Sequence, residues 1–175
     1  MTNISFYLQQ EQSTKSLEQI VSQLIYKAYQ QDNFIYVQTQ NAEQANLIDE
    51  MLWCIQDDTF IPHLNVSNQE NVNLLDNNTE DLSLIKLTPE QQLDSDKYNF
   101  PVIINTPTKN IDINLNRKRK EELLINLDEQ IPLYFSRFHR FAEIISKQET
   151  AKSQARKRYK FYKDRGYPLI THEIN

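Results

Sequence analysis

Positive charge is concentrated in one stretch of the chain, residues 147–166, in a form suited to binding carboxylates. The stretch holds eight lysines and arginines against two acids, a net charge of +6. The whole chain carries −5, which leaves −11 on the other 155 residues. A basic segment on an acidic body is poorly suited to coating a nucleic acid along its length. We expect it to capture a small acidic ligand at one place.

Helical spacing gives this stretch a basic face with an aromatic side chain beside it. At 100° per residue, five side chains fall within an arc of about 100°: Lys152, Arg156, Tyr159, Lys160 and Lys163. A second face gathers two small alanines and an aromatic, which would let the helix pack closely on a sheet: Ala151, Ala155 and Tyr162. An ordinary solvated helix face is the alternative interpretation.

Both ends of this helix carry sequence signals. Ser146, followed three residues later by Glu149, is typical of a capping box at the start. Gly166 is the only glycine of the chain and stands where a helix C′ residue adopts positive φ. Pro168 prevents the helix from continuing. We expect this helix to close the chain.

Catalytic chemistry is sparse in the rest of the sequence. With one glycine, the chain has neither a dinucleotide fingerprint nor a phosphate-binding loop. Three scattered histidines and the single Cys54 cannot complete a zinc site. A nucleophilic pair of Cys54 with His63 is conceivable, but Cys54 ends an apolar helix, where a buried structural cysteine is more common. We therefore expect no enzyme, no cofactor and no metal.

The elements that must position the basic helix begin with a strand–helix–strand–helix series. Residues 3–8 alternate as in a strand, and an amphipathic helix spans 17–29, with its cap near Thr14 or Ser16. Residues 34–38 form the next strand, and Asn41 with Gln44 opens a second helix whose inner side chains are Ala45, Ile48 and Leu52. This order predicts an α/β fold with a mostly parallel sheet.

The second half of the chain is less regular. Residues 65–99 hold seven acids and two lysines and indicate a long polar loop, with 82–87 as a candidate extra strand. Further strands are expected at 100–105, 121–127 and 141–145, separated by a basic turn at 116–121 and a short helix. Pro132 would stand in the first turn of that short helix, which carries Phe135 and Phe138. We treat residues 1–175 as one domain.

Large aromatic side chains surround the end of the second helix. Trp53 is followed by Asp57, Asp58 and then Phe60-Ile-Pro-His63. Such aromatics are either core residues or anchors of a protein interface, with the two aspartates as a polar rim. The sequence leaves both readings open.

The composition also bears on the compartment. No apolar run approaches the roughly 18 residues of a membrane span. The N-terminal residues lack the basic region and cleavage site of a signal peptide, and the lone cysteine fits a reducing environment. We expect a cytoplasmic bacterial protein with no membrane partner.

Three segments in order resemble the chi subunit family of bacterial DNA polymerase III. They are Phe6-Tyr-Leu8 at the start, Leu47-Ile-Asp-Glu-Met-Leu-Trp53 with Phe60-Ile-Pro-His63 in the middle, and Ala155-Arg-Lys-Arg-Tyr-Lys-x-Tyr162 at the end. The similarity extends over the whole chain except 65–99. It implies a Rossmann-like domain, with helices on both faces of the sheet and no nucleotide site. It also implies a non-catalytic adaptor at the nucleoid-associated replisome.

The resemblance further implies two binding sites. One would hold the acidic C-terminal tail of single-stranded-DNA-binding protein, which ends in phenylalanine with a free carboxylate, at Lys152, Arg156, Tyr159 and Lys160. The other would bind the psi subunit, which joins chi to the clamp loader, or a repair helicase, at Trp53, Phe60, Ile61 and Pro62.

The residue types agree with a tail site. Arg156 is suited to bidentate pairing with the terminal carboxylate. An apolar slot for the phenylalanine could be lined by Tyr159, Ile145 and Tyr167, and Lys152, Lys160 and Lys163 supply diffuse positive charge.

Two other classes of function compete with the adaptor. One is a module that binds nucleic acid directly through the basic helix, although the negative body opposes this. The other is an α/β enzyme without a recognised motif. No direct nucleic-acid partner is expected.

Overall fold

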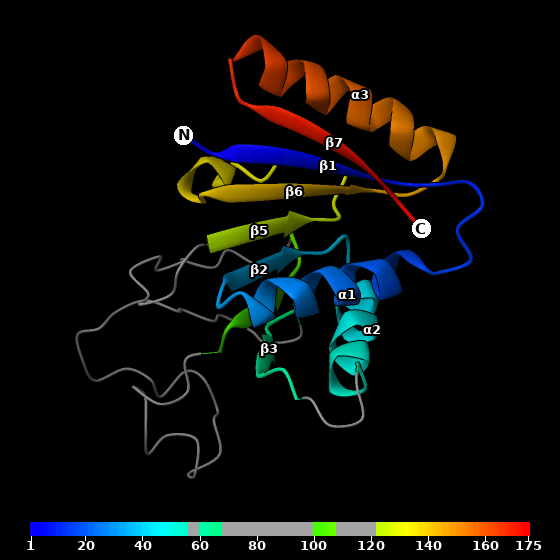
Figure 1. Cartoon of the computed structure of the whole chain (residues 1–175), viewed down its shortest axis with the longest axis vertical. Coiled ribbons are helices and arrows are strands. Elements are labelled where there is room, and N and C mark those ends of the chain that lie inside the picture. Colours follow the sequence, from blue (N-terminus) through cyan, green and yellow to red (C-terminus); the bar gives the residue numbers. More distant parts are fainter. Residues whose placement is uncertain (56–59, 68–99, 108–121) are drawn as a thin grey trace.

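Parallel strands dominate the computed structural model, which describes residues 1–55, 60–67, 100–107 and 122–175. One seven-stranded sheet has the order β3-β4-β2-β5-β6-β1-β7, and every strand pair in it is parallel. The strands are β1 (Asn3–Gln9), β2 (Phe34–Gln38), β3 (His63–Asn65), β4 (Val102–Asn105), β5 (Glu122–Asn126), β6 (Arg140–Ile145) and β7 (Leu169–Ile174). The predicted α/β class with a parallel sheet is confirmed (Figure 1).

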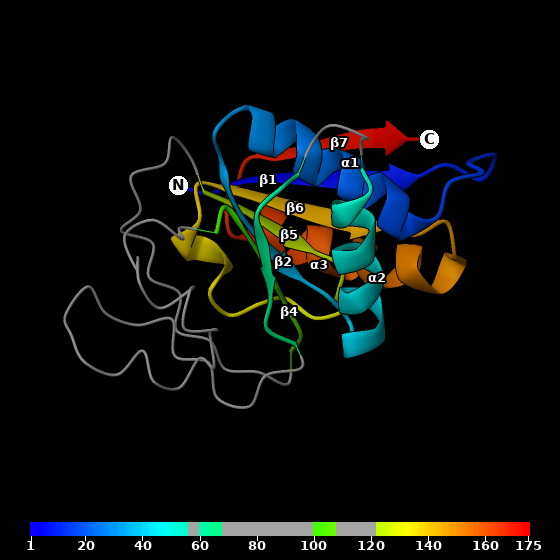
Figure 2. The same ribbon diagram turned by 90° about the horizontal axis from the view of Figure 1, so that it is seen from below.

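Helices cover both faces of this sheet, as predicted. Helices α1 (Leu17–Gln30) and α2 (Ala42–Trp53) pack on one face, against side chains such as Ile35 and Ile144. Helix α3 (Glu149–Asp164) packs on the other, against Phe6 and Phe141. Figure 2 shows α1 and α3 on opposite sides of β1 and β6.

Each of the first two helices begins at a residue whose side chain caps the helix N-terminus. Ser16 accepts a hydrogen bond from Gln19 N at 3.2 Å, while Gln19 Oε1 accepts one from Ser16 N at 2.9 Å, which completes a capping box. Asn41 Oδ1 accepts a bond from Gln44 N at 2.9 Å. Ser16, one of the two predicted caps, is therefore the N-cap of α1, and the predicted start of α2 is confirmed.

The start of α3 differs from the prediction. Its N-cap is Gln148, whose side chain makes no capping bond, so the capping box predicted at Ser146 is wrong. The chain leaves β6 at Ile145 and needs Ser146 and Lys147 to turn onto the sheet face, where the Lys147 amide bonds Gln9 Oε1 at 3.2 Å. Ser146 and Lys147 therefore belong to the turn and not to the helix.

The end of α3 follows the prediction closely. Gly166 has φ 76°, its amide bonds the Lys163 carbonyl at 3.0 Å, and the Tyr167 amide bonds the Tyr162 carbonyl at 3.2 Å. These two bonds form a Schellman motif. The helix does not close the chain, however, because β7 follows it and pairs with β1.

One further expectation is revised, one strand was not predicted, and two predicted segments lie largely outside the described residues. The short helix after Pro132 is a single 3₁₀ turn, η2 (Phe135–Arg137), whose first amide bonds the Pro132 carbonyl at 3.0 Å. Strand β3 was not predicted, because three residues are too few for a periodic pattern. Most of the predicted loop 65–99, including the candidate strand 82–87, lies outside the described residues, as does the basic turn at 116–121.

Candidate functional site

Helix α3 is anchored over β1 by aromatic packing and a buried ion pair. The rings of Tyr159 and Tyr162 lie 5.3 and 6.1 Å from that of Phe6. Beneath the helix, Arg158 Nη2 lies 3.1 Å from Glu143 Oε2 on β6, and both side chains are buried. These contacts fix the helix rotation and therefore the direction of its basic face.

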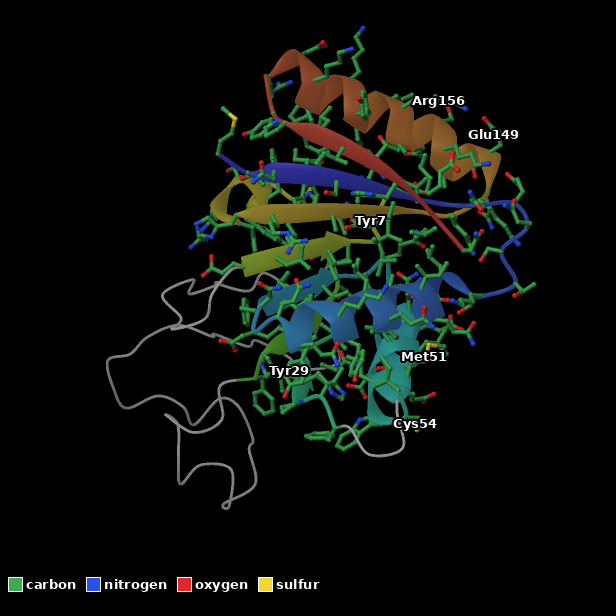
Figure 3. The ribbon with its side chains drawn as sticks, in the orientation of Figure 1. Tyr7, Tyr29, Met51, Cys54, Glu149 and Arg156 are labelled. Carbon is green, nitrogen blue, oxygen red and sulfur yellow. The ribbon has the colours of Figure 1, made fainter. Side chains whose placement is uncertain are left out.

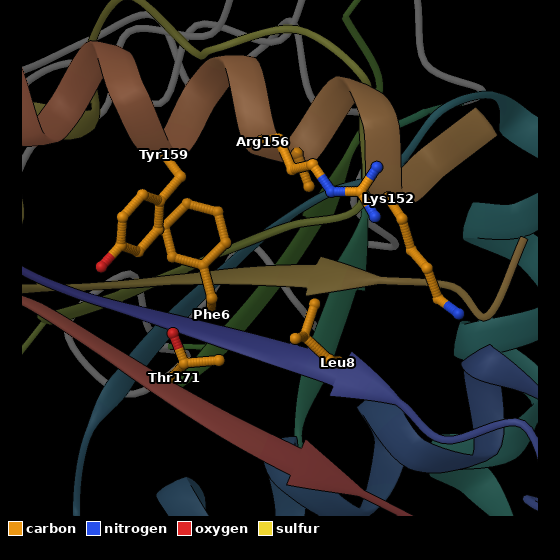
Figure 4. Close-up of a pocket in the computed structure, with 7 residues that line it drawn as sticks. Phe6, Leu8, Lys152, Arg156, Tyr159 and Thr171 are labelled. Carbon is orange, nitrogen blue, oxygen red and sulfur yellow. The ribbon is translucent and has the colours of Figure 1, made fainter. Parts of the chain in front are cut away.

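A pocket of about 240 Å³ opens between α3 and the edge of the sheet formed by β1 and β7. Its lining combines apolar, aromatic and cationic side chains: Phe6, Leu8, Lys152, Ala155, Arg156, Tyr159 and Thr171. Figure 4 shows the rings of Phe6 and Tyr159 side by side at one end, with Arg156 and Lys152 toward the other. The pocket therefore offers an apolar wall beside two positive charges.

Both cations of the pocket are paired with carboxylates of the same chain. Arg156 Nη1 lies 3.0 Å from Glu149 Oε1, on the exposed side of α3 (Figure 3). Lys152 Nζ forms an ion pair with Glu11, which lies between β1 and α1. The hydrogen bond and the charge of Lys152 hold the pKa of Glu11 below its usual value.

Three of the seven residues predicted for this site line the pocket: Lys152, Arg156 and Tyr159. Lys160 and Lys163 are exposed on α3 but do not belong to the lining. Ile145 is 1% exposed, so its predicted place in the apolar slot is corrected. It lies on the inner strand β6, in the core cluster shared with Ala155 and Tyr162 of α3, whereas the pocket opens at the β1–β7 edge.

The apolar wall was missed by sequence reasoning. Phe6 and Leu8 form it from β1, and Thr171 completes the lining from β7. The alternation of Ile4, Phe6 and Leu8 was a usable signal, since period-two side chains share one face of a strand. Tyr167, which was expected in the slot, packs instead against Phe135 with ring centroids 5.3 Å apart.

A second group of side chains lies at the end of α2 and in the segment that follows it. Trp53 and Phe60 are 59% and 52% exposed, and their ring centroids are 4.9 Å apart. Exposure of this size argues against the core interpretation of the pair. Pro62 is half-buried, but Ile61 is fully buried in the core beneath α2, so its predicted place on this surface is corrected. Asp57 and Asp58 lie outside the described residues.

The ring nitrogens of His63 face groups other than Cys54. Cys54 is exposed at the end of α2 (Figure 3), so the expectation of a buried cysteine is wrong. It lies two positions after the buried Leu52, which turns it about 200° away from the core. The buried His63 ring is held through Nδ1, 2.7 Å from the Ile61 carbonyl, with Nε2 3.2 Å from Asp49 Oδ1.

Comparisons with known proteins identify the family. The sequence model of the DNA polymerase III chi subunit, HolC, matches residues 1–170. This chain belongs to the chi subunit family of DNA polymerase III. Curated proteins named DNA polymerase III subunit chi agree along nearly their whole length. The protein from Haemophilus influenzae is 27% identical, and the match covers 97% of this chain and 95% of that protein. The protein from Pseudomonas aeruginosa is 24% identical, and the match covers 99% of this chain and 98% of that protein.

Membership of the chi family makes this chain an accessory replication subunit of the DNA polymerase III complex. The Escherichia coli chi subunit is 22% identical, with 98% of this chain and 97% of that protein covered. Among solved structures, that of T4 UvsW is similar in fold, with a TM-score of 0.62 and 9% identity. The match covers 99% of this chain and 41% of that one. At that identity the likeness concerns the fold alone.

Among the described residues, no three His, Cys, Asp or Glu side chains are grouped in a way that could hold a metal ion. In the same part of the chain, no helix has the length and apolarity to cross a membrane.

Proposed function

We propose that this chi-family chain is a non-catalytic adaptor that links the clamp loader, through the psi subunit, to the acidic C-terminal tail of single-stranded-DNA-binding protein. The observation that carries this proposal is the meeting of Lys152, Arg156 and Tyr159 around one apolar pocket. A C-terminal phenylalanine presents a ring and a carboxylate on the same residue. The pocket presents a matching apolar wall and a matching guanidinium.

The chemistry of each part fits such a ligand. The phenylalanine ring would rest among Phe6, Leu8 and Tyr159, where aromatic pairs gain about 0.5–1.5 kcal/mol beyond area burial. The terminal carboxylate would pair with Arg156, which can donate two parallel hydrogen bonds. Exposed Lys160 and Lys163 would attract the acidic residues that precede the phenylalanine.

The exposed aromatic pair Trp53 and Phe60 is the proposed surface for psi, with Pro62 beside it. Aromatic side chains at the centre of an interface supply much of its binding energy. A repair helicase is an alternative occupant of the same surface. Since both partners would use the same rings, they would compete.

The two proposed sites lie far enough apart to be occupied together. The pocket opens at the β7 edge, whereas Trp53 packs against His63 of β3 with ring centroids 5.3 Å apart, at the other edge. Six strand spacings of about 4.8 Å separate the edges, roughly 29 Å. An adaptor needs this separation in order to bridge two partners, and the bridge would operate in the bacterial cytoplasm, at the replisome.

Retention of single-stranded-DNA-binding protein tests the proposal. We expect immobilised chain to retain the intact partner and to lose it when the partner's last residue is removed. Retention of both forms would place the contact elsewhere. Direct capture of single-stranded DNA without the partner protein would favour the nucleic-acid-binding alternative.

A further inference from the structure

The two cations that line the pocket already have partners within the chain. Lys152 is paired with Glu11 and Arg156 with Glu149. These carboxylates come from different elements, since Glu11 lies between β1 and α1 and Glu149 is the first residue of α3. Each therefore competes for a cation with which a carboxylate of the bound peptide would pair.

We propose that Glu11 and Glu149 are specificity-determining residues of the pocket, which hold its two cations in the free protein and are displaced by the carboxylates of the ligand. This inference rests on the proposed function of the pocket as a site for an acidic peptide with a free C-terminus. It adds that binding is an exchange of ion pairs rather than the filling of an empty cationic site.

The position of Glu11 is fixed by its surroundings. The Gln10 amide bonds the Ile174 carbonyl of β7 at 3.0 Å, and the Ser13 amide bonds the Gln10 carbonyl at 3.1 Å. Lys147, in the turn before α3, donates a bond from Nζ to the Ser13 carbonyl at 3.2 Å. These bonds tie the segment that carries Glu11 to β7 and to the turn before α3, and the carboxylate of Glu11 lies beside Lys152.

Both carboxylates can nevertheless leave. The side chains of Glu11 and Glu149 are 70% and 73% exposed. Exposed ion pairs of this kind contribute little net free energy, because water and salt screen them and two long side chains must be ordered. A ligand that brings its own carboxylates together with an apolar ring can therefore replace them.

The exchange sets how salt acts on binding. In the wild-type chain one set of ion pairs replaces another, so the net number of pairs changes little. With glutamines at positions 11 and 149, the ligand would form new pairs with free cations, and its affinity would fall more steeply with salt.

The test uses the full-length chain and a synthetic peptide with several acidic residues and a C-terminal phenylalanine with a free carboxylate. We expect Glu11→Gln and Glu149→Gln each to bind the peptide about two- to fivefold more tightly at low salt, the range of one exposed ion pair. The gain should shrink toward none near 1 M salt, where the Debye length is about 3 Å. Glu50→Gln on α2 removes the same charge far from the pocket and should leave the affinity unchanged.

Two outcomes separate this inference from the function on which it rests. If wild type binds the peptide and the two variants bind it no more tightly than Glu50→Gln, the exchange is refuted and the tail site stands. If neither wild type nor the double variant binds the peptide, the tail site itself is refuted. Unfolding curves for all variants should coincide with that of wild type, which excludes damage to α3.

Discussion

Two arginines, two positions apart on α3, have opposite environments. Arg156 points to solvent at the rim of the pocket, whereas Arg158 is buried against Glu143. A separation of two residues is about 200° on a helix, so the two side chains face opposite directions. One sequence motif thus supplies both the cation that we propose for ligand binding and a structural one.

Removal of the Arg156 side chain should weaken the binding of the tail peptide. We expect Arg156→Ala to cost about 2–3 kcal/mol, the order of a charge-assisted hydrogen-bonded pair, in a calorimetric titration at low salt. Lys157→Ala is the matched control, because it removes an exposed charge from α3 outside the pocket lining. Equal affinities of the two variants would show that the ligand does not contact Arg156.

Removal of Arg158 should instead destabilise the fold. Glu143 is fully buried, with Arg158 Nε 3.2 and 3.1 Å from its two oxygens, and it accepts a bond from the Tyr162 hydroxyl at 2.8 Å. We expect Arg158→Met to cost about 3–5 kcal/mol of unfolding free energy at neutral pH, because it leaves a carboxylate buried without its cation. Chemical denaturation would measure this loss.

The unfolding free energy lost in Arg158→Met should depend on pH and should be smaller in acid. Burial raises the pKa of Glu143, and the charge of Arg158 opposes this rise. Without Arg158 the folded-state pKa stands well above the unfolded one, so the penalty is largest above the folded pKa and diminishes as pH falls through it. The variant should therefore recover stability relative to wild type on acidification. A constant difference across pH would show that Glu143 is not charged in the fold.

At the scale of elements, local patterns predicted most of what the structure contains. The stripe on α1, the cap at Asn41 and the run 34–38 each carry their own signal, and each lies where it was expected. Strands β3 and β7 were missed, because one is three residues long and the other has mainly exposed side chains. The alternation on β1 indicates the apolar wall, but the place of Thr171 in the pocket lining depends on β7 lying beside β1, a long-range pairing that no local pattern encodes.

Gly166 terminates α3 through its backbone conformation. Its φ is 76°, and an added Cβ would meet nothing within 4 Å, so any cost of substitution comes from the backbone alone. We expect Gly166→Ala to lower the unfolding free energy by about 1 kcal/mol in urea titration, and Gly166→Asn to cost less, since asparagine tolerates this region. Equal stability of the alanine variant would mean that the helix end relaxes without strain.

Substitution of Phe60, in the connection between α2 and β3, tests whether the aromatic pair belongs to an interface or to the core. Because its side chain is 52% exposed, Phe60→Ala should leave the melting temperature nearly unchanged. The buried Phe141 is the control, since its replacement by alanine should cost about 3–5 kcal/mol. The same Phe60 variant should lose psi and retain the tail peptide. A large fall in melting temperature with psi binding intact would contradict the interface.

At the scale of the whole molecule, the basic helix is one small region on an acidic body. The chain carries −5 overall, and the carboxylates Glu11, Glu149 and Glu143 already pair with three cations of α3. A phosphate backbone would meet repulsion beyond the helix and, within it, three cations that are already paired with carboxylates.

The isolated chain should therefore bind single-stranded DNA poorly. We expect no affinity in the micromolar range or tighter at about 0.15 M salt, measured by fluorescence anisotropy with a labelled oligonucleotide. Addition of single-stranded-DNA-binding protein should bring the chain onto the DNA, and its form without the last residue should not. Micromolar binding by the chain alone would make direct nucleic-acid binding the better account of α3.

Strand β1 is synthesised long before the two strands with which it pairs, β6 and β7. It emerges first from the ribosome among the strands, yet Ile4 pairs with Phe141 on one side and Leu169 on the other. At about 5–20 residues per second, translation reaches Leu169 roughly 8–33 s after Ile4. Because Phe6 and Leu8 of this strand form the apolar wall, a nascent chain cannot yet offer the pocket. The pocket can therefore form, and the proposed ligand can bind, only after translation has supplied strand β7.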